Sequence, residues 1–284
     1  MHRRCPGLVV RGLIACVPAL GLFMAFGPAA GASASSAPSA QAASIAIAAL
    51  KNLAIGQHAP NHLTSPSSLR VKGLSQVQST NWSGYADTSE TFSSVTGSWT
   101  EPSASCTSAT SLAAFWVGID GYSSDSVEQD GTLIECYRDT AYHYTWWEMY
   151  PTNDIQVVGE TLSAGDTISA SVVRSGTRYT LKVTDSTHTA NSFSTTQTCS
   201  GCANSSAEWI AEAPSGSSGV EPLSDFHSWT LTGATASTTA GSGVISTFPD
   251  DEITMTNSSS QVKAQPGALN SSGNGFSVTW DRSS

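Results

Sequence analysis

The sequence predicts an all-β protein, an antiparallel β-sandwich in which two sheets pack face to face. From Asn81 onward, short segments alternate apolar or β-branched residues with small polar ones, and clusters of Gly, Asp, Asn or Ser separate them. The same region contains no amphipathic helical stretch of useful length. Residues 77–284 are long enough for two packed sheets, and no fixed-period repeat points to a propeller.

Residues 1–34 are typical of a secretory signal peptide. Arg3, Arg4 and Arg11 precede or interrupt an apolar run that ends near Phe26, and small residues follow with several A-x-A-like cleavage points. No other segment approaches the roughly 18 to 20 continuous apolar residues that a membrane span requires. We therefore expect a secreted, extracellular protein with no membrane partner.

Residues 35–76 are predicted to form a propeptide. They are rich in Ala, Ser and Pro, contain the only plausible helical run (44–56) and carry no acidic residue. All 22 acidic residues lie at or after Asp87, so residues 77–284 hold 6 basic against 22 acidic residues, a net charge of −16. A basic propeptide complements this acidic body near neutral pH, and we expect it to stay bound until the carboxylates protonate. A flexible N-terminal linker is the alternative.

The acidic excess of the body also excludes classes of partner. It repels nucleic acid and anionic membranes, and it suits a protein that works in acid, where protonation reduces self-repulsion.

Four cysteines remain after the signal peptide, an even number in an oxidising compartment, which predicts two disulfides among three connectivities. We favour Cys106 with Cys136 and Cys199 with Cys202. A zinc site would require two further ligands at a suitable spacing, which the sequence lacks. We expect neither a metal nor another cofactor.

The predicted strands follow one another along the chain with short polar breaks. The clearest alternating segments are 93–102, 167–176, 177–186, 226–236 and 275–281, and the sequence RSGTR predicts a hairpin turn between the second and the third.

The first candidate site segment is TWWEMYP, 145–151. On a strand, Trp146, Glu148 and Tyr150 share one face, and Trp147 and Met149 share the other. Aromatic stripes of this kind form core more often than binding surface, so the segment alone decides nothing.

Two further segments contain polar residues in apolar surroundings. In residues 115–136, a strand, a turn and a returning strand bring Trp116 close to Gln129. In AEWIAEAP, 207–214, Glu208 and Glu212 face one way and Trp209 the other. A glutamate against apolar walls has a raised pKa because its ionised form is poorly solvated, which makes it a usable acid or base in acidic medium.

Several familiar catalytic templates are absent from the sequence. There is no G-x-S-x-G elbow, no H-E-x-x-H and no pair of D-T-G or D-S-G motifs. His143, His188 and His227 have no neighbouring residues that indicate a Ser/His/Asp triad.

Taken in order, these segments resemble the glutamic peptidases, or eqolisins, whose type members are fungal acid proteases. The matching elements are NWSGY (81–85), WVGIDG (116–121), VEQDG (127–131), WWEMYP (146–151), GDTI (165–168) and AEWIAE (207–212). None is specific alone, but six in the family's order cover nearly all of residues 80–236.

The resemblance implies two roughly seven-stranded antiparallel sheets of concanavalin-like or jelly-roll shape, with polypeptide substrate bound across a concave face. It implies a pepstatin-insensitive, monomeric endopeptidase whose catalytic pair is Gln129 and Glu208: the glutamate activates water, and the glutamine amide hydrogen-bonds the water and the oxyanion. The residues that it implies line or support the cleft are Trp82, Trp116, Asp120, Trp146, Glu148 and Tyr150.

The chain departs from the family pattern at two positions. Tyr144 stands where the fungal members carry an Asp, so one acidic contact is lost. Asp130 follows the catalytic glutamine where they have a neutral residue, although strand alternation directs its side chain away. Glu212 is expected to be a solvated bystander at a strand end.

The alternative function is that of a secreted carbohydrate-active protein. Eight tryptophans could stack on sugars, and Glu208 with Glu148 could form a glycosidase carboxyl pair. A lectin-like binding module is a third class. Both would tolerate Gln129→Ala, which should abolish peptide hydrolysis.

Overall fold

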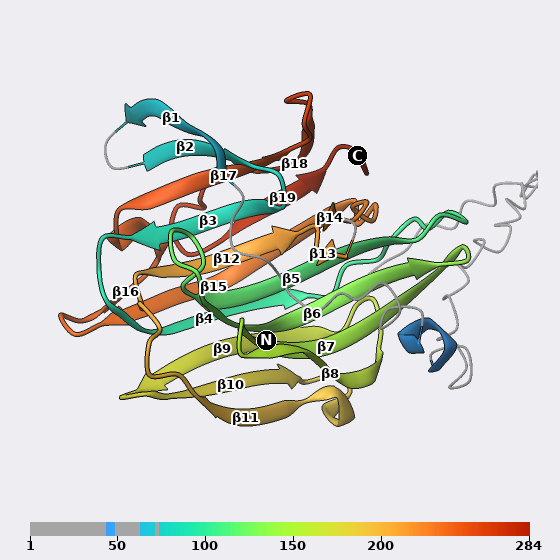
Figure 1. The fold of residues 1–284 in the computed structure, drawn as a ribbon, viewed down its shortest axis with the longest axis horizontal. Helices are drawn as coiled ribbons and strands as arrows, with labels where there is room; N and C mark the ends of the chain where they lie inside the picture. The colour runs from blue at the N-terminus through green and yellow to red at the C-terminus, as the bar shows by residue number, and fades with distance from the viewer. Residues whose placement is uncertain (1–43, 49–62, 72–73, 218) are drawn as a thin grey trace, which may run out of the picture. The chain divides into compact units, whose positions relative to one another are not determined.

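The computed structural model describes residues 44–48, 63–71, 74–217 and 219–284. Its strands form two layers (Figure 1). The first layer contains, in spatial order, β1 (Leu63–Val71), β2 (Leu74–Ser79), β17 (Asp250–Thr256), β3 (Trp82–Thr88), β12 (Ser206–Glu212), β5 (Ser111–Ile119), β6 (Val127–Tyr137), β7 (Thr140–Tyr150) and β8 (Asn153–Leu162).

The second layer packs against the first. In spatial order it contains β11 (Phe193–Thr198), β10 (Arg178–Asp185), β9 (Thr167–Ser175), β4 (Phe92–Thr100), β15 (Ser228–Thr238), β19 (Phe276–Trp280) and β18 (Val262–Pro266). The short elements are β13 (Ser215–Gly216), β14 (Gly219–Val220), β16 (Ser242–Gly243) and the 3₁₀ turns η1 (Thr189–Asn191) and η2 (Ile245–Thr247).

The two layers belong to one hydrogen-bonded sheet. The hairpin of β17 and β18 joins them, because β17 pairs with β3 in the first layer while β18 pairs with β19 in the second. The prediction of an all-β, essentially antiparallel fold is therefore confirmed. The prediction of two separate seven-stranded sheets is wrong, since a continuous ladder of 17 strands turns back on itself.

The main core lies between the layers and is rich in aromatic side chains. Trp229 of β15 stacks on Phe115 of β5 with ring centroids 5.4 Å apart, and Trp99 of β4 meets the edge of Trp229 at 5.7 Å. Contacts of this kind stabilise a core beyond the burial of apolar area. They fix the two layers against each other.

The alternating segments form the strands that their pattern predicts. β9 and β10 run from Thr167 to Asp185, with every second side chain buried, and the hairpin at RSGTR joins them. By contrast, β6 and β12 are buried on both faces almost throughout. The second layer packs against one face of these strands, and the buried cluster on the other face includes Ala46 and Ile47.

The N-terminal region contributes two described pieces. Residues 44–48 form a helix within the predicted helical run, whereas the predicted signal peptide and residues 49–62 lie outside the described part. β1 and β2 form a hairpin, and β2 pairs in parallel with β17. The predicted propeptide boundary after residue 76 falls inside β2.

Both favoured disulfides are confirmed. Cys106 is bonded to Cys136, and Cys199 is bonded to Cys202.

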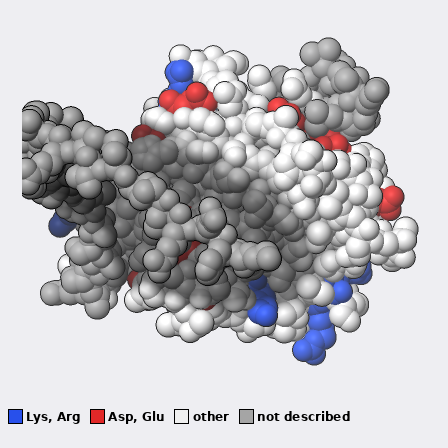
Figure 2. Space-filling view, turned by 180° about the vertical axis from the view of Figure 1, so that it is seen from behind, with Lys and Arg blue, Asp and Glu red and all other residues white. Residues whose placement is uncertain are grey.

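Charged side chains are sparse over much of the described surface in Figure 2, where Lys and Arg gather at the lower edge. Among the described residues, no helix has the length and apolar character needed to cross a bilayer.

Candidate active site

Three neighbouring strands of the first layer bring the catalytic candidates onto one face. Gly118 of β5 lies directly opposite Gln129 of β6 on one side and opposite Glu208 of β12 on the other. Residues paired across a sheet point to the same face, and adjacent strands lie about 4.8 Å apart. Gln129 and Glu208 therefore flank Gly118, with Cα atoms about 10 Å apart by this spacing.

The position between the two side chains requires glycine. A Cβ atom on Gly118 would lie 2.7 Å from the ring of Trp116 and 3.3 Å from Cβ of Gln129. The first of these distances is well inside van der Waals contact. Glycine at this position thus lets Trp116 lie against the strand and keeps the gap between Gln129 and Glu208 clear of a side chain.

The amide of Gln129 is oriented by a neighbouring carboxylate. Its Nε2 donates a hydrogen bond of 2.9 Å to Oε2 of Glu148, which lies opposite it on β7. Within the described part of the structure, Oε1 of Gln129 has no hydrogen-bond partner. Because an amide nitrogen carries two hydrogens, one N–H remains for a further acceptor.

Glu208 is fully buried, and neither of its oxygens makes a hydrogen bond with any described residue. Burial raises its pKa well above the ordinary range, and the nearby carboxylates Asp120, Glu128 and Asp87 add to the rise, while the hydroxyl of Ser206 opposes it. Asp130 is not among these neighbours. Burial and the neighbouring carboxylates therefore both disfavour the ionised form of Glu208 in this structure.

Aromatic side chains surround this pair on the same face. Trp82 and Trp116 pack edge to face with centroids 4.9 Å apart, and Trp146, with the partly buried Tyr150, belongs to the same cluster. Trp147 and Met149 pack into the core on the opposite face, as alternation predicts. The three tryptophans of the cluster are fully buried.

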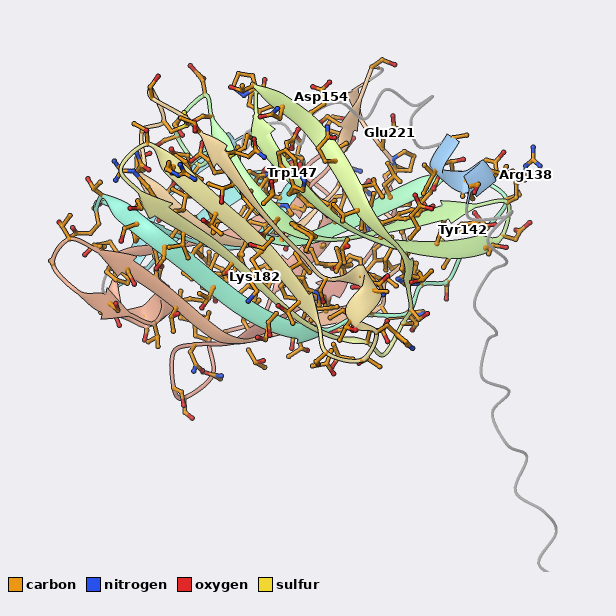
Figure 3. The ribbon with its side chains drawn as sticks, turned by 90° about the horizontal axis from the view of Figure 1, so that it is seen from below. Arg138, Tyr142, Trp147, Asp154, Lys182 and Glu221 are labelled. Atoms are coloured by element: carbon orange, nitrogen blue, oxygen red, sulfur yellow. A yellow bond between two sulfur atoms is a disulfide. The ribbon has the colours of Figure 1, made fainter. Side chains whose placement is uncertain are left out.

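The helix at residues 44–48 contributes to this same buried cluster. Ala46 and Ile47 pack in it together with Tyr142. Tyr142 lies near the start of β7, close to the turn that carries Arg138 (Figure 3). A segment of the predicted propeptide thus lies on the face that carries Gln129 and Glu208.

Asp120 supports the strand that carries Glu208. Its carboxylate accepts hydrogen bonds from the backbone N–H groups of Asn204 (2.7 Å) and Ser205 (2.8 Å), directly before β12. Asp120 has a φ of 71°, an uncommon conformation for a residue other than glycine. The structure shows how it fixes the start of β12, whereas the predicted contact with substrate stays a prediction.

Glu212 differs from the expectation. It ends β12, as predicted, but it is fully buried and not solvated, because its Oε2 accepts a hydrogen bond of 2.8 Å from the indole N–H of Trp116. A buried indole N–H is usually paired with an acceptor. Glu212 therefore holds Trp116 in place.

The structure shows where the side chains of Tyr144 and Asp130, the two departures from the family pattern, lie. Tyr144 donates a hydrogen bond of 3.0 Å to Glu135, so an acid from the neighbouring strand occupies that region, and burial raises the pKa of Glu135 to about 7. Asp130 is paired with Val117 and faces the core between the layers, away from Glu208, as alternation predicts.

One acidic residue on this face was missed by the sequence reasoning. Asp251 of β17 lies opposite Ala86, which is itself opposite Glu208, and the hydroxyl of Tyr122 donates a hydrogen bond to it. The only sequence signal is the run Asp250, Asp251 and Glu252, which by itself is typical of a solvated turn.

The model of the Peptidase A4 family matches residues 80–280. The chain belongs to this family, the eqolisin glutamic peptidases. The match begins at NWSGY and ends in β19, so it includes every strand that carries a residue of the candidate site. Its members hydrolyse peptide bonds, and this eqolisin is accordingly a peptidase.

Two characterised relatives agree with this assignment. Aspergillopepsin-2 of Aspergillus niger is 29% identical over 212 residues, which cover 66% of this chain and 73% of that protein. Scytalidopepsin B of Scytalidium lignicola is 32% identical over 148 residues, 50% of this chain and 55% of that protein.

Solved structures show the same fold. Scytalido-glutamic peptidase with a transition state analog inhibitor superposes with a TM-score of 0.61 at 23% identity, over 71% of this chain and 98% of that one. SCP-B in a complex with the tripeptide Ala-Ile-His gives a TM-score of 0.59 at 23% identity, over the same shares. Aspergilloglutamic peptidase from Aspergillus niger gives 0.51 at 27% identity, over 60% and 99%.

Proposed function

We propose that this eqolisin is a secreted acid endopeptidase that uses Glu208 and Gln129 as a catalytic pair and is insensitive to pepstatin. The observation that supports this proposal most strongly is the register that sets the two residues on either side of Gly118 on one face. A carboxyl and an amide, spaced with a gap between them, can hold a water molecule and a scissile carbonyl together.

Glu208 supplies the proton transfers. Its carboxylate takes a proton from the water as the water attacks the carbonyl carbon, and its carboxyl then gives that proton to the departing amine. In the covered chain, burial raises the pKa of Glu208 and disfavours the carboxylate form that acts as the base. Release of the covering segment would readmit water and bring the pKa down toward the working range.

Gln129 supplies a side-chain amide that donates a hydrogen bond to the developing oxyanion. The N–H that is not bonded to Glu148 can donate to the developing oxyanion, and the amide keeps this donor at every pH. A second carboxyl at this position would instead share a proton with Glu208 and split their pKa values. With an amide at position 129, Glu208 is the member of the pair that titrates, and the donor does not change with pH.

The N-terminal segment is proposed to act as an inhibitory propeptide. Ala46 and Ile47 pack in the cluster that surrounds the pair, and Gln129 and Glu208 are fully buried in the full-length chain. Substrate can reach the pair only after the cover leaves. Secretion by the predicted signal peptide and a monomeric state complete the proposal.

The direct test is to incubate the purified, processed chain with denatured protein from acid to neutral pH, with and without pepstatin. We expect cleavage that is greatest in acid and unaffected by pepstatin. Inhibition by pepstatin would contradict the assignment. A glycosidase or a lectin would retain its function in Gln129→Ala, so loss of proteolysis in that variant also separates the alternatives.

A further inference from the structure

A serine, a histidine and an aspartate meet at the surface of the molecule, on other elements than those that carry Gln129 and Glu208. Ser105 Oγ lies 3.1 Å from Nε2 of His227, and Nδ1 of His227 lies 3.2 Å from Oδ1 of Asp225. The hydroxyl is thus on one ring nitrogen and the carboxylate on the other. This is the order of contacts that activates a serine nucleophile.

Backbone contacts hold the three residues together. Ser105 and Asp225 form an isolated antiparallel bridge, in which the N–H of Ser105 donates to the carbonyl of Asp225 at 2.8 Å. The disulfide of Cys106 fastens the next residue to β6. The backbone positions of Ser105 and Asp225 are therefore fixed by the fold.

His227 is held in an unusual backbone conformation. Its φ is 58°, its N–H donates to Oδ1 of Asp225 at 3.1 Å, and its carbonyl accepts a hydrogen bond of 3.0 Å from the N–H of Trp280. Residues other than glycine adopt positive φ rarely, and such conformations gather at functional sites. The side chain of His227 is 55% exposed, so a ligand can reach it.

A groove is lined by residues that neighbour the constellation in sequence. It has a volume of about 410 Å³, and Ser228, which follows His227, and Pro102, three residues before Ser105, line it. Ser98, Thr100 and Thr230 also line it, and the hydroxyls of Ser98 and Thr230 pair with those of Ser169 and Ser277. The volume lies within the range of small-molecule sites. Its hydroxyls suit a ligand that itself carries hydroxyl groups.

We propose that Ser105, His227 and Asp225 form a second hydrolytic site that cleaves short-chain carboxylic esters of hydroxylated alcohols. Ser105 Oγ attacks the acyl carbon as its proton passes to His227 Nε2. The bond from that carbon to the alcohol oxygen then breaks, and the alcohol leaves with the proton. Water next attacks the acyl-Ser105, His227 relays its proton back to Ser105, and the free carboxylic acid departs.

The exposure of the site selects esters over peptides. Hydrogen bonds at a wet surface stabilise a transition state less than those in a closed, water-excluding site. An alcohol departs more easily than an amine, so an ester needs less of this stabilisation. The second site is consequently independent of the proposed acid peptidase chemistry, and its failure would leave that proposal intact.

The test uses the full-length chain carrying Glu208→Gln, so that proteolysis does not contribute. Near neutral pH, where an imidazole accepts protons, we measure hydrolysis of p-nitrophenyl acetate and labelling by a fluorophosphonate probe, with the labelled peptide identified by mass spectrometry. We expect labelling on Ser105. Ser105→Ala and His227→Gln should each lower hydrolysis by at least about 10²-fold.

Ser103→Ala is the matched control, because Ser103 is also exposed and lies two residues away. It should retain the full rate of hydrolysis and the label. Ser105→Ala in the otherwise unchanged chain should keep its acid proteolysis. Hydrolysis in Ser105→Ala equal to that of its parent, or a label on another serine, would overturn the proposal.

Discussion

The face of the first layer that carries Glu208 and the outward face of the second layer differ in how their polar groups are paired. On the first, Glu208 is buried without a hydrogen-bond partner among the described residues. On the second, hydroxyls pair with each other across strands, as in Thr96 with Thr235 (2.7 Å) and Thr230 with Ser277 (2.7 Å).

The difference shows which face of this fold carries polar groups that can titrate. Paired hydroxyls are neutral and satisfied at every pH, so the second face contributes solubility without titration. An unpaired buried carboxyl costs free energy and changes its proton affinity, and at the proposed active site this change can serve proton transfer. The predictions below test this contrast, beginning with the largest effect.

Glu208→Gln should remove nearly all peptidase activity. The substitution keeps the shape of the side chain and removes its ability to take a proton from water, which is worth up to about 10⁴-fold in rate. The measurement is kcat/KM on a peptide substrate in acid. Glu90→Gln, at an exposed position, is the matched control and should leave the rate unchanged.

Gln129→Ala should lower kcat by about 10²- to 10³-fold, the usual effect of losing one oxyanion donor. KM should change little, because the donor acts mainly in the transition state. Steady-state kinetics separate the two parameters. A rise in KM at constant kcat would instead assign Gln129 to ground-state binding.

The stability of the fold should fall as pH rises. Burial, aided by the nearby Asp250, raises the pKa of Asp87 to about 9, whereas an unfolded aspartate titrates near about 3.9. Between these values the unfolded state ionises and the folded state does not, so the stabilisation present in acid is lost at about 1.4 kcal/mol per pH unit.

Asp87→Asn removes this titration and should flatten the loss between acid and neutral pH. Urea unfolding at several pH values gives the free energy of unfolding for both proteins. Asp281→Asn, at an exposed position near the C-terminus, serves as the control. Parallel curves for Asp87→Asn and the parent would show that the carboxyl ionises equally in the folded and unfolded states.

Thr230→Val should have the smallest effect. The hydroxyl bonds only to that of Ser277 on an exposed face, where water can replace it. Surface substitutions of this kind usually change stability by less than about 0.5 kcal/mol. Thermal unfolding measures the change, and the acid peptidase rate should be unaltered. A large loss of either would mean that the Thr230 hydroxyl contributes more than its pairing with Ser277.

Much of the fold follows from alternation in the sequence. The pattern in 167–186 is enough to place β9, β10 and their hairpin, because one face of each strand is core and the other is wet. The join between the layers could not be predicted in this way, since the pairing of β17 with β2 and β3 depends on contacts far apart along the chain.

The site was predictable to the extent that motifs fix local register. Alternation is enough to place Trp146 and Trp147 on opposite faces of one strand, and Glu208 and Trp209 on opposite faces of another. It could not show that Glu212 bonds Trp116, because that partner lies 96 residues away. Alternation likewise could not predict the contact of Ser105 with His227, because these residues are 122 positions apart.

The most direct test of the central claim is a double-mutant cycle of Glu208→Gln and Gln129→Ala, measured as kcat/KM in acid after removal of the N-terminal segment. If the two residues act on one water and one carbonyl across Gly118, the double variant should be scarcely slower than Glu208→Gln alone. Losses that multiply would contradict the account, because they would mean that the two residues act independently.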